Sequence, residues 1–574
     1  MDPNSVTWVG FRNVVADNST GNRSDANVNR RLAHDKERER ERENRWAEAR
    51  KKQASTPLMD LWLLVLLSLI TLAAALKFLS FFPAYNSRKK RLPPGPPTLP
   101  LLGSILWLSR SLFDIEPVLR QLRVKYGPIL TLYIGTRPAV FITDRSLAHE
   151  ALVTKGSLFS DRPPPTVAGR IISANQHNIS SAAYGPLWRL LRRNLMSEIL
   201  HPSRVKSFAE GRKWVLELLI KRLRSHEEKG EAVRVVESLQ RAMFCLLLLM
   251  CFGQKLEESA VEEIERVQRR LLTRLVRFNI FAFLPRLGRI VFRKRWQWLL
   301  ETRAEQERVL TSLIRARTDR QEGCQDEEKK KNSFEFSYVD SLLALELPED
   351  GRKLMETEMV SLCSEFLDGG TDTTTTTLQW ILANLVRNQD KQAKLAEEIE
   401  GVVGKEGEIK EEDLEKMPYL KAVILEALRR HPPGHFVLPH AVSEEVTLAG
   451  YVIPKNASIN FTVAEIGVDK EVWEDPLEFR PERFLKEEGV EGVDITGSRE
   501  IKMMPFGVGR RICPGLGLAL LHLEYFVANL VREFQWKPKK DGEIIDLSEK
   551  LEFTVVMKNP LEAKIISRRS EEAK

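Results

Sequence analysis

The sequence has 574 residues, of which 43% are hydrophobic and 29% charged. Its 25 Phe and 11 Trp supply the apolar surface of a large core, which excludes a wholly disordered or collagen-like chain. The 88 basic and 80 acidic side chains leave a net charge of +8, which would suit a nucleic acid, an anionic membrane or an acidic protein partner. Five cysteines without a C-x-x-C pair predict neither a disulfide framework nor a zinc ribbon, and they favour a reducing compartment.

The first 58 residues differ in composition from the rest of the chain. They are rich in Asn, Asp and Arg, and charge dominates from position 35 to 52. Such a segment cannot bury enough apolar surface to fold alone. The alternating signs at 36–43 permit a solvated helix but give it no apolar face for docking. We expect residues 1–58 to be a disordered or spurious N-terminal extension.

Residues 59–82 contain an apolar run with no charged residue between positions 61 and 76. At a helical rise of about 1.5 Å per residue, positions 61–82 would span roughly 33 Å, close to the hydrocarbon thickness of a bilayer. A cleaved signal peptide is the alternative, but the run is long and no small-residue cleavage site precedes the basic cluster at 88–91. We therefore expect residues 59–82 to be a single transmembrane anchor.

Basic residues on both sides of this run give conflicting signals about its orientation. The cluster at 88–91 places the C-terminal bulk of the chain in the cytoplasm by the positive-inside rule. The basic residues at 50–52 oppose that orientation. A translation start at Met59 would remove the conflict, and it agrees with a spurious extension before that residue.

After the anchor, residues 83–97 combine the basic cluster with Pro-Pro-Gly-Pro-Pro, which predicts a stiff extended hinge before a body at 98–574. Alternating and β-branched residues predict strands at 131–135, 139–143, 444–462 and 551–566. Apolar residues at helical spacing predict helices at 205–225, 234–252, 257–278, 294–320, 354–387 and 389–403. The expected fold is mainly α with minor β sheets.

The most informative segment is residues 505–515, Pro-Phe-Gly-Val-Gly-Arg-Arg-Ile-Cys-Pro-Gly, which precedes an apolar helical run at 516–531. A cysteine in a glycine-rich loop before a helix lies near unpaired backbone donors, which favour a thiolate able to bind a metal. The glycines would let a flat cofactor approach the backbone. The alternative is a buried structural cysteine.

Within this segment, Phe506-x-x-Gly509-x-Arg511-x-Cys513-x-Gly515 resembles the haem-ligand signature of the cytochrome P450 family. The resemblance implies that fold from about position 93 to 564, haem b as cofactor, and Cys513 as the axial thiolate on its iron. It also implies that Phe506, Gly509 and Gly515 surround the haem.

Two further motifs resemble the same family. Gly369–Thr374 is expected to interrupt a long helix, with Thr373 and Asp372 supplying protons for oxygen reduction; a kink with threonines bonding back to the preceding turn is the alternative. The pair in Glu426-Ala-Leu-Arg429, which alone would mean little, resembles part of a buried triad with Arg483 that fixes the ligand loop.

The remaining site residues are placed by the same resemblance. The haem propionates are expected to contact four side chains, namely Trp188, Arg192, His440 and Arg511. The distal substrate pocket is expected to include Ser364, Phe366, Gly369, His435, Phe436, Val437 and Phe553. This apolar and aromatic mixture predicts a lipophilic substrate, for which fatty acyl chains, terpenoids and phenolics all qualify.

The expected activity is a monooxygenase reaction, in which one atom of O2 enters the substrate and the other becomes water. A separate membrane-bound, NADPH-dependent reductase would supply the electrons, and the single-pass anchor would hold the enzyme on the cytoplasmic side of the endoplasmic reticulum.

The alternatives are a haem-thiolate isomerase or dehydratase without a reductase, against which Asp372 and Thr373 argue, and a non-catalytic membrane haem or lipid binder. No groove-reading or aromatic-basic motif favours a nucleic-acid role.

Overall fold

The computed structural model describes residues 38, 40–48, 62–75, 92–97, 115–134, 137–275, 278, 280–283, 286–323, 336–485 and 493–568. The chain divides into two compact units, Met1–Lys90 and Arg91–Lys574. The first unit contains a helix at 40–48 and an apolar helix at Trp62–Ala75, whose large apolar side chains are exposed. The rest of the predicted anchor and residues 83–91 of the predicted hinge lie outside the described residues.

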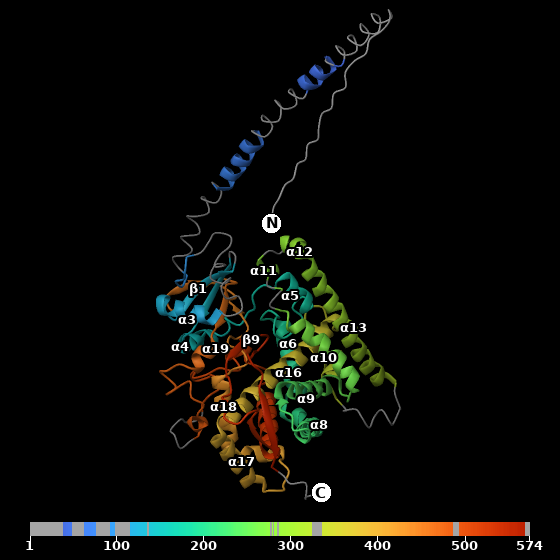
Figure 1. Ribbon diagram of the computed structural model, residues 1–574, viewed down its shortest axis with the longest axis vertical. Coiled ribbons are helices and arrows are strands. Elements are labelled where there is room, and N and C mark those ends of the chain that lie inside the picture. Colours follow the sequence, from blue (N-terminus) through green and yellow to red (C-terminus); the bar gives the residue numbers. More distant parts are fainter. Residues whose placement is uncertain are drawn as a thin grey trace, which may run out of the picture. The chain divides into compact units, whose positions relative to one another are not determined.

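The second unit is mainly helical (Figure 1). Its helices, in chain order, are α3 (Ile115–Tyr126), α4 (Arg145–His149), α5 (Val167–Ile172), α6 (Pro186–Asn194), α7 (Pro202–Ser207), α8 (Ala209–Glu228), α9 (Val235–Phe252), α10 (Glu258–Leu272), α11 (Ile280–Phe283), α12 (Leu287–Val291), α13 (Arg293–Gly323), α15 (Tyr338–Leu343), α16 (Glu356–Arg387), α17 (Gln389–Val403), α18 (Pro418–Arg430), α19 (Val463–Gly467) and α20 (Leu516–Glu533). This composition confirms the predicted class of mainly α with minor β.

Within the described part of the chain, the strands form four small sheets. The largest has the order β1 (Ile129–Ile134), β2 (Arg137–Ile142), β7 (Ser458–Phe461) and β4 (His440–Ala441). The others are β3 (Val233–Arg234) with β11 (Glu562–Ser567) and β8 (Phe534–Pro538), β5 (Val446–Leu448) with β6 (Tyr451–Ile453), and β9 (Glu549–Leu551) with β10 (Val555–Met557). In the largest sheet β7 is parallel to β2 and antiparallel to β4, which places His440 opposite Ile459. The sheet therefore joins segments separated by about 300 residues of chain.

Helix α16 passes through the core of the second unit and packs against α9, α13, α18 and α20 (Figure 1). Helix α9 also has the length and hydropathy of a membrane span, but 78% of it is buried inside the fold. Its apolar residues face several sides because α8 and α16 cover it, which is the pattern of a buried core helix. Among the described residues it is the one helix that meets both criteria, and its burial accounts for its composition.

The described end of the Pro-rich segment contacts the first strand of the body. The Thr131 amide donates to Pro94 O at 2.8 Å, and a Cβ at Gly95 would lie only 2.0 Å from Thr131 O. Only glycine therefore allows this close approach, which explains the glycine within the proline run.

Candidate active site

The glycine-rich loop before α20 folds back on itself around Cys513. The amide of Cys513 donates to Phe506 O at 2.9 Å, and Gly507 and Gly509 adopt φ angles of 69° and 77°. A Cβ at Gly509 would lie 2.2 Å from Leu152 O, so a larger residue would displace the backbone. The glycines are needed for the loop to hold the cysteine just ahead of the helix.

The electrostatics at Cys513 differ from the expectation of a pre-formed thiolate. Burial raises the pKa of the Cys513 thiol, while the Gly515 amide and the positive charge of Arg192 oppose that rise without cancelling it. The chain alone therefore favours the neutral thiol. A bound metal cation would reverse this balance, because it stabilises the thiolate and the thiol proton then leaves to solvent.

Cations and donors gather beside this sulfur. The guanidinium of Arg511 lies 4.6 Å from the centroid of the Trp188 indole, and that of Arg192 lies 5.8 Å from it. The Arg511 guanidinium donates to three backbone carbonyls, those of Ser160, Ile179 and Ala182. Trp188 Nε1 is buried with no acceptor among the described residues. The guanidinium of Arg192 is half-buried, and its contact among these residues is with the Trp188 ring. The Trp188 N–H and the Arg192 guanidinium are therefore available to donate hydrogen bonds to an anion.

His440 and Arg162 complete this side of the site. The Nδ1 of His440 donates to Phe159 O at 2.6 Å, and burial together with the charges of Arg162 and Arg511 lowers the pKa of His440 to about 3. Its Nε2 is therefore an acceptor unless an anion binds nearby. Arg162, to which no sequence motif points, is half-buried, and desolvation lowers its pKa to about 10. It donates to the carbonyls of Ser180, Leu438 and Pro439.

Helix α16 is continuous through Gly369–Thr374, so the expected interruption there is wrong. The helix persists because it is packed in the core, which offsets the low helix propensity of two glycines. The two glycines differ in surroundings: a Cβ at Gly370 would lie 2.7 Å from Leu247 Cδ1 of α9, whereas nothing lies within 4 Å of one at Gly369. The Thr373 hydroxyl donates to Gly369 O at 2.7 Å, back to the preceding turn.

Three carboxyls on α16 have a raised pKa, and in each case burial is the main cause. Asp372 forms an ion pair of 3.4 Å with Arg269, which opposes the rise. Glu365 accepts hydrogen bonds from the amides of Ile179 and Ser180 at 2.7 and 2.6 Å. Since Ile179 O also accepts from Arg511, this segment connects α16 to the cysteine loop. Glu365, Asp368 and Arg269 were missed, although acidic residues in an apolar helix were a usable signal.

The predicted triad is assembled and fully buried. Arg429 donates to Glu426 through Nε and Nη2 at 2.7 and 2.8 Å, and Arg483 Nε donates to Glu426 Oε1 at 3.1 Å. The Arg480 amide adds a donor at 2.9 Å, and Arg429 also reaches the carbonyls of Gly467 and Pro476. A buried carboxylate with this many donors holds α18 to the 467–483 segment.

The predicted pocket residues fall into separate environments. Ser364 is buried and hydrogen-bonded to Gln268 and Gln306, and the Phe366 ring contacts Tyr338 of α15. Phe436 packs edge-on against Phe141, while the ring of His435 lies between two carboxylates.

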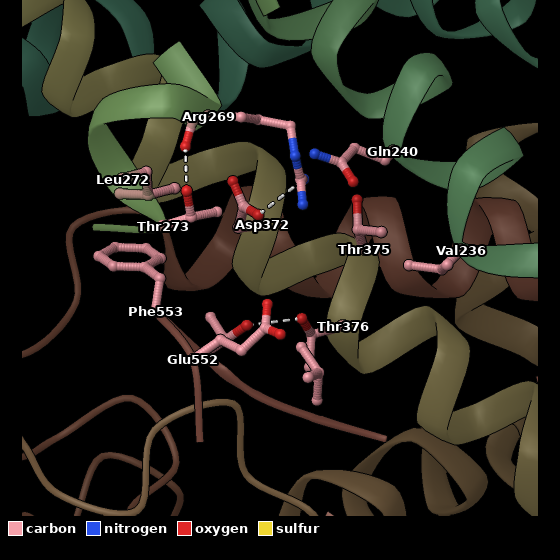
Figure 2. Close-up of a pocket in the computed structure, with 12 residues that line it drawn as sticks. Val236, Gln240, Arg269, Leu272, Thr273, Asp372, Thr375, Thr376, Glu552 and Phe553 are labelled. Atoms are coloured by element: carbon pink, nitrogen blue, oxygen red, sulfur yellow. Dashed lines mark hydrogen bonds and ion pairs between the residues drawn. The ribbon is translucent and has the colours of Figure 1, made fainter. Parts of the chain in front are cut away.

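A small pocket with a volume of about 40 Å³ brings Phe553 together with Asp372 (Figure 2). Arg269, Thr376 and Glu552 also line it, and Figure 2 shows the ion pair of Arg269 with Asp372 at one side. Phe553 comes from the β9–β10 turn, and Asp372 from α16. The pocket therefore joins one predicted substrate residue to one predicted catalytic residue.

Comparison with known proteins identifies the family. The family model described as cytochrome P450 matches residues 93–566. The chain belongs to the cytochrome P450 family. It is 48% identical to cytochrome P450 89A9 of Arabidopsis thaliana over 88% of this chain and 98% of the relative. It is 30% identical to geraniol 8-hydroxylase of Catharanthus roseus over 86% of this chain and 98% of that protein.

The fold agrees with this assignment. A zebra fish cytochrome P450 solved with abiraterone matches with a TM-score of 0.63 and 22% identity, over 79% of this chain and 99% of the other. Family and fold imply haem b as the cofactor, and this P450 is a monooxygenase of the plant type.

Proposed function

We propose that this P450 binds haem b with Cys513 as the axial ligand and Trp188, Arg192 and Arg511 as the binding groups for its carboxylates. The observation that carries the proposal is the unsatisfied buried donor Trp188 Nε1, which lies beside the half-buried guanidinium of Arg192 near Cys513. Arg192 is close enough for its charge to act on the sulfur. Two carboxylates and one metal cation would satisfy the donors and the thiol together.

His440 belongs to this proposed group through its position on β4. A carboxylate next to its Nε2 would favour the imidazolium and counteract the charges of Arg162 and Arg511. Phe506, Gly509 and Gly515 would shape the loop around the sulfur, and Glu426, Arg429 and Arg483 would hold the neighbouring segment in place.

The haem, when bound, supplies the site at which O2 is activated. Asp372 and Thr373 are proposed to move protons on the α16 side. Burial raises the pKa of Asp372, so its carboxyl keeps a proton to a higher pH than an ordinary aspartate, and Arg269 opposes this. The Thr373 hydroxyl donates to Gly369 O in this structure, so to pass a proton on it would have to turn away from that carbonyl while its lone pairs accept a hydrogen bond from the proton source. The open side of Gly369 leaves room beside this hydroxyl.

The proposed substrate is a small lipophilic molecule. Phe436, Val437 and Phe553 supply apolar contact area, and Ser364, Phe366, Gly369 and His435 complete the proposed set. Two relatives, named geraniol 8-hydroxylase and flavonoid 3',5'-hydroxylase, support a terpenoid or a phenolic compound as the class of substrate.

A separate NADPH-dependent reductase is proposed as the electron donor. Arg510 of the cysteine loop is exposed and can serve as a docking charge; it donates to the Tyr184 hydroxyl at 2.6 Å. The guanidinium groups of Arg510 and Arg189 both contact the Tyr184 ring, so the two charges lie close together. Such a basic surface suits an acidic flavoprotein. The exposed apolar helix Trp62–Ala75 supports a single membrane anchor. We propose that it lies in the endoplasmic reticulum with the enzyme on the cytoplasmic side, the side that the basic residues at 88–91 favour.

Reconstitution with an NADPH-dependent reductase in lipid tests this function. We expect NADPH- and reductase-dependent oxygenation within a terpenoid and phenolic panel, and about a 100-fold lower product yield per NADPH for Thr373→Ala. The matched control is Thr357→Ala, an exposed threonine of the same helix. Equal yields for both variants would contradict the role of Thr373, and turnover of a pre-oxidised substrate without reductase would favour an isomerase or dehydratase.

A further inference from the structure

His435 lies between carboxylates from two elements far away in the sequence. Its Nδ1 contacts Glu116 Oε1 of α3, and its Nε2 lies 3.5 Å from Glu549 Oε2 of β9, an ion-pair distance without hydrogen-bond geometry. The side chain is 9% exposed. Both ring nitrogens therefore face acceptors, and only the imidazolium carries a proton on both nitrogens. The geometry selects the charged form of His435.

The charged groups around the ring favour the same form. Arg120 of α3 lies 3.7 Å from Glu116 and binds Glu465 of α19 at 2.5 Å, so it shares Glu116 with His435. Burial lowers the pKa of His435, but the hydrogen bond that its ring donates to Glu116 and the charges of Glu116 and Glu549 outweigh burial and the charge of Arg120, so the pKa is raised.

His431, four residues earlier in the extended segment after α18, behaves in the opposite way. Its Nδ1 lies 3.0 Å from Glu549 Oε1, and its ring stacks on Trp380 at 4.1 Å between centroids. Burial, with the nearby charges of Arg430 and His435, lowers its pKa, so His431 is the neutral donor of the pair. Glu549 thus faces one neutral and one charged histidine, and their contacts hold its pKa below the ordinary value against burial.

These contacts reach the walls of the proposed substrate pocket. The His435 carbonyl accepts from the Val463 amide at 2.7 Å, and Phe436 follows it in the chain. Glu549 begins the β9–β10 hairpin, whose turn carries Phe553. The far strand of that hairpin is held by the Val555 amide, which donates to Pro433 O at 2.9 Å. Three segments therefore meet at one imidazole.

We propose that the His435 imidazolium is a positioning residue that holds α3 and the β9–β10 hairpin against the 435–437 wall of the substrate pocket, and that this clamp loosens as pH rises. The proposal rests on the proposed function only for the identity of the pocket; the clamp itself is independent of haem and turnover. Because the folded protein raises the His435 pKa, its contribution is complete below the ordinary histidine pKa and is lost as pH rises through the folded value.

Hydrogen exchange of the Val555 amide between pH 6 and 9, corrected for intrinsic exchange, tests the clamp in the full-length, haem-loaded protein. We expect wild-type protection to fall about tenfold across the titration, and His435→Gln to stay at the low level throughout. His226→Gln is the matched control, because His226 forms a histidine–glutamate pair of 3.6 Å with Glu231 at the end of α8. It should behave like wild type.

Glu549→Gln adds a second arm, because it keeps the side-chain shape and removes one charge. It should move the protection transition to lower pH and leave the fold intact. Protection in wild type that does not change with pH, or His435→Gln protection equal to wild type at pH 6, would overturn the proposal. A normal reduced carbon-monoxide spectrum in the same samples separates this failure from a failure of the haem assignment.

Discussion

Trp188 is a single side chain whose surroundings make sense only with an anionic partner. An unsatisfied buried donor costs about 1–3 kcal/mol, so the isolated indole N–H destabilises the chain that carries it. Arg511 over one face adds a second donor group and no acceptor. A residue that is unfavourable in the protein alone and favourable with a ligand points to binding.

Trp188→Phe tests this, because it should weaken haem binding without lowering the stability of the apoprotein. The ring contacts are largely kept and the N–H is removed, so we expect haem affinity to fall by about 1.5–3 kcal/mol, the value of a hydrogen bond to a charged group, while the apoprotein becomes no less stable. Haem transfer to apomyoglobin measures haem affinity, and urea unfolding measures the stability of the apoprotein. Trp298→Phe, on α13, should change haem affinity little; equal losses for both variants would contradict the assignment.

At this scale the sequence predicted residues that belong to a local motif and missed those that act across the fold. Cys513 and the Glu426–Arg429 pair could be found because their spacing is recognisable within a few positions. Arg162 could not, since its partners lie 18 or more residues away and are backbone groups that every residue type offers. Glu365 could have been singled out as an acidic residue in an apolar helix, but its backbone partners, 185 and 186 residues away, could not. The role of burial at Cys513 was also outside local reasoning.

Among the elements, α16 is where helix stability and site geometry compete. Its two adjacent glycines lower helix propensity by about 1 kcal/mol each relative to alanine. Gly370 lets α9 approach, and Gly369 leaves open space beside Thr373. One glycine therefore serves packing, and we infer that the other serves the site.

Alanine at the two positions should separate these roles. Gly369→Ala should raise stability by about 1 kcal/mol, through helix propensity, and reduce product yield because the methyl group enters the open space. Gly370→Ala should destabilise, since overpacking against buried Leu247 costs about 1–3 kcal/mol and exceeds the propensity gain. Chemical unfolding of both variants checks this, and equal shifts of the same sign would refute it.

Helix positions were predictable because apolar spacing is local, whereas pairing and continuity were not. The 354–387 and 389–403 predictions lie within about two residues of α16 and α17. The break expected at Gly369–Thr374 failed because tertiary packing overrides propensity. The parallel pairing of β2 with β7 depends on contacts that no local pattern contains.

For the whole molecule, the division into Met1–Lys90 and Arg91–Lys574 separates the proposed anchor from a body that has its own core. The four core clusters that the described residues form lie within the second unit. The body should therefore fold without the first unit, since its buried apolar surface is self-contained.

Deleting residues 1–90 should release the enzyme from alkaline-carbonate-washed membranes while its haem content stays the same. Deleting residues 1–58 keeps the predicted anchor at 59–82, so this shorter variant should resist carbonate extraction like the full chain. Fractionation followed by haem quantification measures both. A full-length chain that carbonate extracts would contradict the anchor.

The central claim is that Cys513 ligates the haem iron, and the absorption spectrum of the reduced, carbon-monoxide-bound protein tests it most directly. Wild type and Cys245→Ser, a variant of another free cysteine, should both show the red-shifted Soret band of thiolate ligation. Cys513→Ser should lose it. A folded, haem-loaded wild type without that band, or a Cys513→Ser variant that retains it, would contradict the account.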